Sequence, residues 1–172
     1  NNAEPSLGAA LGLELPVLSL NLAYLWGNYD ADARRSYQIA SADLRAHLGP
    51  ITIDAEVAWR QTQYTRAGSP GGEDQFWKWG WWVQVDWQVI GGLHITGAVD
   101  SLAVKDMYLA GFGLTPDPTF AVTDDNNRIL RGILGVSYTT IGGVLLRLNG
   151  EYWEFSDFND AWVVQAGIGW AF

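Results

Sequence analysis

The chain has 172 residues, enough for one domain, and contains no cysteine, which excludes disulfides and thiolate metal sites. Its net charge of −9 argues against a nucleic-acid partner. No apolar run reaches the roughly 18 residues that a transmembrane helix needs, so such a helix is excluded. The chain carries no signal peptide, so either one was cleaved or the chain is a piece of a longer protein.

Alternation of apolar and polar residues predicts four strands in the first sixty residues. They cover residues 6–15, 18–26, 37–47 and 51–60, with the last strand alternating most regularly. Pro16 and the Gly49-Pro50 pair mark tight turns, because proline cannot donate to a sheet ladder and glycine tolerates turn conformations. Longer polar loops are expected at residues 27–36 and 65–75.

The same alternation predicts five further strands, over residues 77–89, 93–100, 129–139, 144–152 and 161–172. The pairs Gly91-Gly92 and Gly142-Gly143 read as tight turns, whereas residues 102–127 and 156–160 read as loops. The sequence therefore predicts a single all-β domain over residues 1–172, made of about nine antiparallel strands.

The connections alternate between short and long, which is typical of a transmembrane β-barrel with short periplasmic turns and longer external loops. Large aromatic residues of the apolar face gather at both strand ends, as expected for the two membrane interfaces. We expect the interface set to be Trp26, Trp59, Trp77 and Trp162 beside the long loops, and Trp87, Tyr138, Trp170 and Phe172 beside the tight turns or the chain end. A soluble sandwich would instead bury Asp54, Glu56 and Arg60 together.

The opposite face of the predicted strands is polar and carries both signs of charge. We expect it to line the barrel interior through Asp43, Arg45, Asp54, Glu56, Arg60, Lys78, Gln84, Asp86, Asp100, Arg131, Arg147, Asn149 and Glu151. Two interpretations remain open: a water-filled pore wall, or a narrow barrel whose interior charges pair with one another, for example Arg147 with neighbouring acids.

No catalytic residue, metal site or cofactor is predicted. His47 and His94 are the only side chains suited to act as a base at neutral pH, and both lie near tight turns. The chain lacks G-x-S-x-G, H-E-x-x-H and phosphate-loop motifs. The stretch Thr123–Asn127 offers oxygen ligands for Ca²⁺ but lacks the D-x-D-x-D-G spacing, so a plain loop is favoured.

Residues 161–172 have the length and pattern of a membrane-spanning barrel strand and end in phenylalanine. They resemble the C-terminal closing strand of bacterial outer-membrane β-barrels. The wider region from Val99 is similar to the C-terminal end of general porins, in the superfamily that includes the phosphate-selective porins. The matching pieces are Val99-Asp100-Ser101-Leu102, Asp124-Asp125-Asn126-Asn127, Arg131 with Gly135 and Tyr138, Val144-Leu145-Leu146-Arg147 with Glu151-Tyr152, and Gln165 with Phe172.

The resemblance covers under half of the chain and implies a diffusion channel in a bacterial outer membrane. It also implies a lipid-bilayer environment and recognition of the last strand by the barrel assembly machinery. Porins are often homotrimers, although no residue pattern here indicates one. Phosphate selectivity is not carried over, because anion channels use ladders of Arg and Lys and this chain is acidic.

An odd strand count conflicts with the even number found in bacterial barrels. We favour the C-terminal portion of a larger barrel of roughly 14 to 18 strands. A small barrel of roughly 8 or 10 strands stays open. The expected function is passive diffusion of small hydrophilic solutes or ions with a mild cation preference. The alternative is a narrow structural barrel that anchors or completes an envelope assembly.

Overall fold

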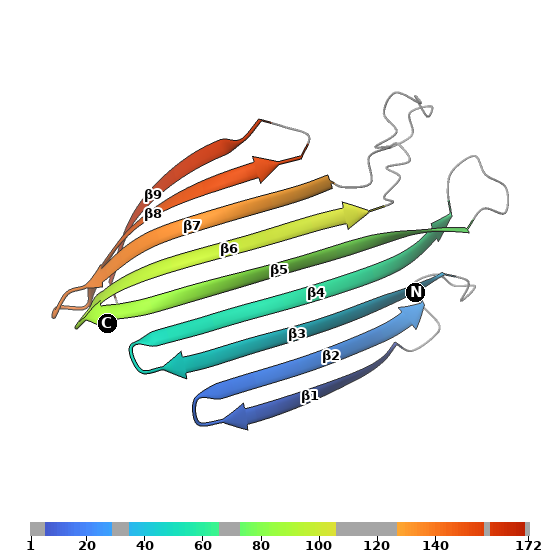
Figure 1. The fold of residues 1–172 in the computed structure, drawn as a ribbon, viewed down its shortest axis with the longest axis horizontal. Coiled ribbons are helices and arrows are strands. Elements are labelled where there is room, and N and C mark those ends of the chain that lie inside the picture. The colour runs from blue at the N-terminus through green and yellow to red at the C-terminus, as the bar shows by residue number, and fades with distance from the viewer. Residues whose placement is uncertain (1–5, 29–34, 66–72, 106–126, 157–158, 171–172) are drawn as a thin grey trace.

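The computed structural model describes residues 6–28, 35–65, 73–105, 127–156 and 159–170, which form one antiparallel sheet (Figure 1). Nine strands follow one another in chain order, each paired with its neighbours in sequence. They are β1 (Leu7–Leu15), β2 (Leu18–Asn28), β3 (Ser36–Leu48), β4 (Ile51–Thr65), β5 (Glu73–Ile90), β6 (Leu93–Lys105), β7 (Asn127–Thr139), β8 (Val144–Phe155) and β9 (Ala161–Trp170). The predicted all-β antiparallel architecture with nine strands is confirmed.

Several strands extend further at their loop ends than the alternation predicts. β4 continues to Thr65 and β5 begins at Glu73, so both ends of the expected loop over residues 65–75 belong to the sheet. β6 similarly runs to Lys105. The ladder continues here because polar side chains pair across it. The backbone N and Oγ of Ser36 donate to Gln63 Oε1 at 3.0 and 2.9 Å.

The register places apolar residues opposite apolar residues on one face of every strand pair. Leu11 faces Leu22, Ala42 faces Val57, and Val83 faces Val99. No described element packs against this face: Ala103 is the only buried hydrophobic residue among the described positions. Leu134, Val164 and Ile168 expose 67, 77 and 72% of their surface. The sheet is therefore a single layer without a core of its own.

The described residues contain no helix that is long and apolar enough to span a membrane.

The sheet is strongly curved, so that β8 and β9 curl away from the plane of β1 and β2 (Figure 1). Within the described residues β1 and β9 do not pair, and the sheet is open. The tight turns lie along one end of the sheet, and the opposite ends of the strands, which we call the loop ends, lie along the other (Figure 1).

Each tight turn is displaced along the sheet relative to the one before it. Leu18, the first residue of β2, pairs with Ala46, and Ala46 pairs with Ile53, two residues after β4 begins at Ile51. The same displacement recurs twice more. Ile51 pairs with Trp87, and Trp87 pairs with Ile95, two residues after β6 begins at Leu93. Leu93 pairs with Tyr138, and Tyr138 pairs with Leu146, two residues after β8 begins at Val144. Each hairpin therefore lies two residues further along than its predecessor, and the strands are inclined to the line of turns.

Glycine is required by conformation in three of the tight turns, where Gly49, Gly92 and Gly143 have φ of 64, 78 and 76°. Gly92 is more constrained than Gly49, because an added Cβ would collide with the backbone carbonyl oxygen of Thr139. A Cβ at Gly49 would meet nothing within 4 Å.

We expect Gly92→Ala to destabilise the folded protein by clearly more than Gly49→Ala. Gly49→Ala carries only the left-handed backbone cost of about 1–2 kcal/mol. Gly92→Ala adds the collision with Thr139, whose N–H donates to the Gly92 carbonyl at 2.8 Å. Urea unfolding, followed by tryptophan fluorescence, measures the difference. Equal costs for the two variants would contradict the geometry of this turn.

Candidate functional site

The polar face carries a continuous row of partner residues that crosses all nine strands. We call this the central polar row. Its members, each the Cα partner of the next, are Gly12, Asn21, Asp43, Glu56, Trp82, Asp100, Arg131, Trp153 and Ala161. The row exists because the period-two alternation is in phase across every strand pair, so the polar residues accumulate on one side.

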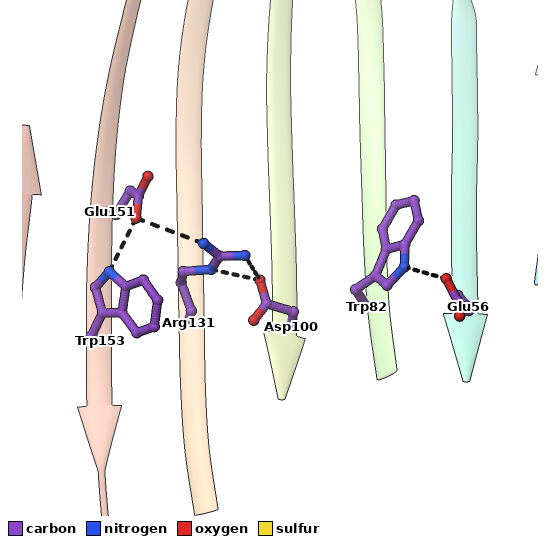
Figure 2. A network of polar contacts seen from close by, with 6 residues as sticks. All are labelled: Glu56, Trp82, Asp100, Arg131, Glu151 and Trp153. Carbon is purple, nitrogen blue, oxygen red and sulfur yellow. Dashed lines mark hydrogen bonds and ion pairs between the residues drawn. The ribbon is translucent and has the colours of Figure 1, made fainter. Parts of the chain in front are cut away.

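The β6–β8 half of the central polar row is held by one arginine (Figure 2). Nε and Nη2 of Arg131 each lie 2.7 Å from Asp100 Oδ2, and Nη1 lies 3.9 Å from Glu151 Oε2. The Arg131 guanidinium also stacks over the Trp153 ring, 4.8 Å from its centroid. Trp153 Nε1 donates to Glu151 Oε2 at 3.1 Å. Two acids and one base thus form a closed, mutually satisfied cluster.

The β2–β5 half of the row has a different character. Asp43 and Glu56 are direct Cα partners, and neither forms an ion pair with a described base. Each accepts a hydrogen bond from a neutral donor instead. Asn21 Nδ2 donates to Asp43 Oδ1 at 2.8 Å, and Trp82 Nε1 donates to Glu56 Oε2 at 3.0 Å (Figure 2). Like charges face each other here, an arrangement that is costly unless water screens it.

Two other charged contacts lie on this face towards the tight turns. Arg45 Nε donates to Asp54 Oδ1 at 2.5 Å, and the Asp54 side chain is the less exposed of the pair. His94 Nδ1 lies 2.7 Å from Asp86 Oδ1, while Thr96 Oγ1 donates to Asp86 Oδ2 at 2.8 Å. His94 is therefore held by a carboxylate and His47 contacts Thr52 Oγ1 at 3.2 Å.

The predicted pairing of Arg147 with an acid is not found among the described residues. Its Cα partners are Ser137 and Gly167, which offer no carboxylate. Asn149 lies between Gly135 and Gln165, and Gln84 lies between Asp54 and Ala98. All of the residues predicted to line the interior share the polar face of the sheet. That they line a pore stays a prediction.

A hollow of about 620 Å³ opens on the polar face beside the central polar row. Its lining includes Glu56, Arg60, Lys78, Gly80, Trp82 and Asp100. Arg60 and Lys78 are direct Cα partners, so two bases face each other at one end of the hollow. The hollow combines side chains of both charges with an indole ring.

Two tryptophans, Trp82 and Trp153, lie on the polar face and were not among the predicted site residues. The sequence does contain the signal for them, because each falls in the polar phase of its strand. Hydrophobicity alone would assign a tryptophan to the apolar face. For Trp82 and Trp153 the position in the alternation, rather than the residue type, gives the correct face. Their indole N–H groups explain the placement, since each bonds a carboxylate.

The predicted interface aromatics lie at the two ends of the apolar face. At the loop end, the Trp59 and Trp77 rings lie 5.3 Å apart, and Trp162 lies 4.7 Å from Tyr152. Trp26 lies near the loop end of β2. At the turn end, Trp87, Tyr138 and Trp170 expose 44, 40 and 64% of their surface. Phe172 lies outside the described residues.

The three turn-end aromatics follow the displacement of the hairpins. The partner series from Trp87 runs through Ile95 to Val136, and Tyr138 lies two residues beyond Val136. The series from Tyr138 runs through Leu146 to Ile168, and Trp170 lies two residues beyond. These rings therefore form a belt parallel to the line of tight turns rather than to the rows of partners.

Among the described residues no three His, Cys, Asp or Glu side chains are grouped so that they could hold a metal ion. The candidate calcium loop lies outside the described residues, apart from the backbone of Asn127 at the start of β7. No protein-family model matches the sequence, and no curated protein matches it.

We expect Arg131→Met to destabilise the protein by about 1–3 kcal/mol, because Asp100 and Glu151 lose the one cationic partner that the described residues give them. Arg147→Met is the matched control: it removes the same charge from the same face but breaks no described ion pair, so we expect a change within about 0.5 kcal/mol. Urea unfolding, followed by tryptophan fluorescence, measures both changes in stability. A similar cost for the two variants would mean that the Arg131 cluster contributes nothing to stability.

Proposed function

We propose that this sheet forms the wall of a transmembrane β-barrel in a bacterial outer membrane, and that its polar face lines a water-filled channel for small hydrophilic solutes or ions. The observation that carries the proposal is the apolar face itself. It extends over nine strands, and no described element covers it. Soluble monomers rarely expose apolar patches larger than a few hundred Å². A lipid bilayer covers such a face without a second protein layer.

The displacement of the hairpins supports the same proposal by an independent route. Each hairpin is displaced by two residues, which is about 6.6 Å along the strand direction. Successive hairpins are two strands apart, which is about 9.6 Å across the sheet. The strands are therefore inclined by about 35° to the perpendicular of the line of turns. If the tight turns lie in one membrane surface, the strands are tilted by that angle from the membrane normal. Strands of outer-membrane barrels tilt by roughly 35–45°.

The turn-end aromatic belt supports this orientation. Trp87, Tyr138 and Trp170 lie along the line of turns, which is where a membrane surface would lie if the strands are tilted. Tryptophan and tyrosine concentrate at membrane–water interfaces. At the loop end of β7 and β8, the positions of the apolar face are occupied by charged residues. Arg128 Nη2 lies 3.2 Å from Glu154 Oε1 there. An apolar band bounded in this way fits a bilayer.

Closure of the barrel requires more than these nine strands if it is to be antiparallel throughout. β1 and β9 run in the same direction, from the loop end to the turn end, so pairing them would make a parallel seam. An odd number of further strands, from the same polypeptide or another, closes the barrel with antiparallel pairs. The sheet is then part of a larger barrel, and we propose that the barrel assembly machinery recognises β9.

The polar face favours a hydrated channel over a narrow barrel filled by its own ion pairs. Asp43 faces Glu56 as a direct Cα partner, and neither forms an ion pair with a described base. In a closed, dry interior this like-charge pair would be strongly unfavourable, whereas water in a channel screens it. Acids outnumber bases on this face, which supports a mild cation preference.

We expect the natively extracted protein to give steady nanosiemens-scale current steps in a planar bilayer. In a salt gradient the reversal potential should lie on the cation side, because the wall is net acidic. Heat-modifiable migration on gels confirms that the inserted protein is folded. Folded insertions that carry no current would contradict the channel and favour a narrow structural barrel.

We expect Val83→Arg to impair folding into lipid vesicles by about 2–4 kcal/mol, because Val83 lies on the apolar face midway along β5. Gln84→Arg, the next residue along the same strand, points to the polar face and should cost little. The fraction folded in vesicles, read by gel migration, measures both. If both variants fold equally well, the apolar face does not contact lipid.

A further inference from the structure

Trp82 lines the hollow on the polar face, and its four nearest neighbours on that face differ in kind. Its Cα partners are Glu56 on β4 and Asp100 on β6. Along β5, the alternation places Gln84 on one side of it and Gly80 on the other. All five residues line the hollow. Three polar side chains therefore border the indole, and the fourth neighbour has no side chain.

The Trp82 ring is held by its edge, and its face is left for stacking. The indole N–H donates to Glu56 Oε2 at 3.0 Å (Figure 2). Among the described residues, no aromatic ring and no cation stacks on Trp82. Trp153 also donates to a carboxylate but differs in this respect, because the Arg131 guanidinium lies 4.8 Å from its ring centroid. Trp82 is therefore the better placed of the two rings to stack on a solute.

The polar groups around the indole keep unused hydrogen-bonding capacity. Glu56 accepts the indole N–H through Oε2, and Asp100 accepts from Arg131 through Oδ2 (Figure 2). The other oxygen of each carboxylate accepts no hydrogen bond from a described donor. The Gln84 amide forms no hydrogen bond with another described residue. The border of the ring thus offers two carboxylate oxygens as acceptors and an amide that both donates and accepts.

Apolar surface continues from Trp82 along the hollow. Leu102 on β6 is the Cα partner of Gly80 and is 48% exposed. A Cβ added to Gly80 would lie 3.5 Å from Leu102 Cδ1, so the leucine side chain leans over the glycine. An apolar floor with a few polar groups around it is the lining typical of small-molecule sites. The volume of about 620 Å³ also lies within the range of about 300–1,000 Å³ for such sites.

We propose that the hollow binds a neutral sugar, with one pyranose ring stacked on Trp82 and its hydroxyl groups bonded to the polar border. A pyranose has a face of C–H groups and a rim of hydroxyls, so it matches an aromatic ring surrounded by acceptors. Its hydroxyls donate to Glu56 and Asp100 and accept from the Gln84 amide. As a step in passage through the channel, this site rests on the proposed function. Passage requires weak binding, so we expect a dissociation constant of about 10 mM.

A solute with a net charge suits this part of the wall less well. A cation is attracted by Trp82 and Glu56 but also meets Arg60 and Arg131, which line the same hollow. An anion approaches Glu56, which forms no ion pair with a described base. A neutral solute takes hydrogen bonds from these groups without repulsion by either sign. Its affinity should therefore not depend on ionic strength, whereas salt screens the binding of a charged solute.

The test is a saturation-transfer NMR titration of the natively extracted protein with methyl β-D-glucopyranoside, in an oligo-oxyethylene detergent that carries neither sugar nor charge. Sorbitol has the hydroxyls without the ring face, and tetramethylammonium is a cation that can stack on the indole. We expect the glucoside to bind at least about fivefold more tightly than either, with the same affinity at low and high salt. Equal binding of sorbitol, tighter binding of tetramethylammonium, loss of the glucoside at high salt, or no binding of it would overturn the proposal.

Substitutions assign the stacking. Trp82→Leu should weaken glucoside binding by at least about fivefold, whereas Trp82→Phe keeps an aromatic face and should retain most of the affinity. Trp153→Leu is the matched control, because Trp153 also lies on the polar face and donates to a carboxylate but does not line the hollow. Gel migration verifies folding of each variant. Equal losses in Trp82→Leu and Trp153→Leu, or in Trp82→Leu and Trp82→Phe, would overturn the stacking site.

Glu56→Gln tests the polar border. It replaces a charged acceptor by a neutral one and should weaken glucoside binding by about threefold. The substitution also removes the repulsion between Glu56 and Asp43, so it should not impair folding. An unchanged affinity in this variant would overturn the part assigned to Glu56.

The titration does not depend on conductance, so the two proposals fail separately. Current steps without preferential glucoside binding would leave the channel and overturn this site. Preferential binding by a protein that carries no current would support the hollow as a sugar site and overturn its role in passage.

Discussion

The period-two register of one continuous antiparallel ladder is the constraint on which the rest of this structure depends. A slip of one residue in any strand pair would move that strand's apolar set to the opposite face. The one register irregularity among the described pairs lies between Gln88 and Ile90, beside a turn, and Trp87 still faces Ile95. Both faces therefore stay uniform across nine strands, and the apolar face needs a cover that the described chain does not supply.

Two features of the sheet share one geometry. The hairpins step by two residues, and the turn-end aromatic rings of Trp87, Tyr138 and Trp170 step with them. Packing against a second sheet would not require rings to follow the line of turns, because a sandwich fills its core along the rows of contacting side chains. A planar boundary crossed by tilted strands does require it. The proposed bilayer accounts for the step and the belt together.

The sequence predicted the strands and their faces because alternation is a local property. It also located the tight turns, where Gly49, Gly92 and Gly143 adopt positive φ. It underestimated how far several strands extend at their loop ends. Contacts such as Ser36–Gln63 depend on the register between strands and leave no apolar pattern in the sequence. The displacement of the hairpins, and the absence of an acid opposite Arg147, likewise depend on which residues become partners. A single strand does not encode that information.

The sequence left two interpretations of the polar face open, a hydrated wall and a set of self-paired charges, and the contacts divide the face between them. Around β6–β8, Arg131 satisfies Asp100 and Glu151, so these charges are committed to holding neighbouring strands together. Around β3–β5, Asp43 faces Glu56, and neither Glu56 nor Arg60 forms an ion pair with a described residue of opposite charge. Such charges gain most from water, which screens them. On the proposed channel wall, the β6–β8 side therefore stabilises the sheet, and the β3–β5 side is left to interact with what passes.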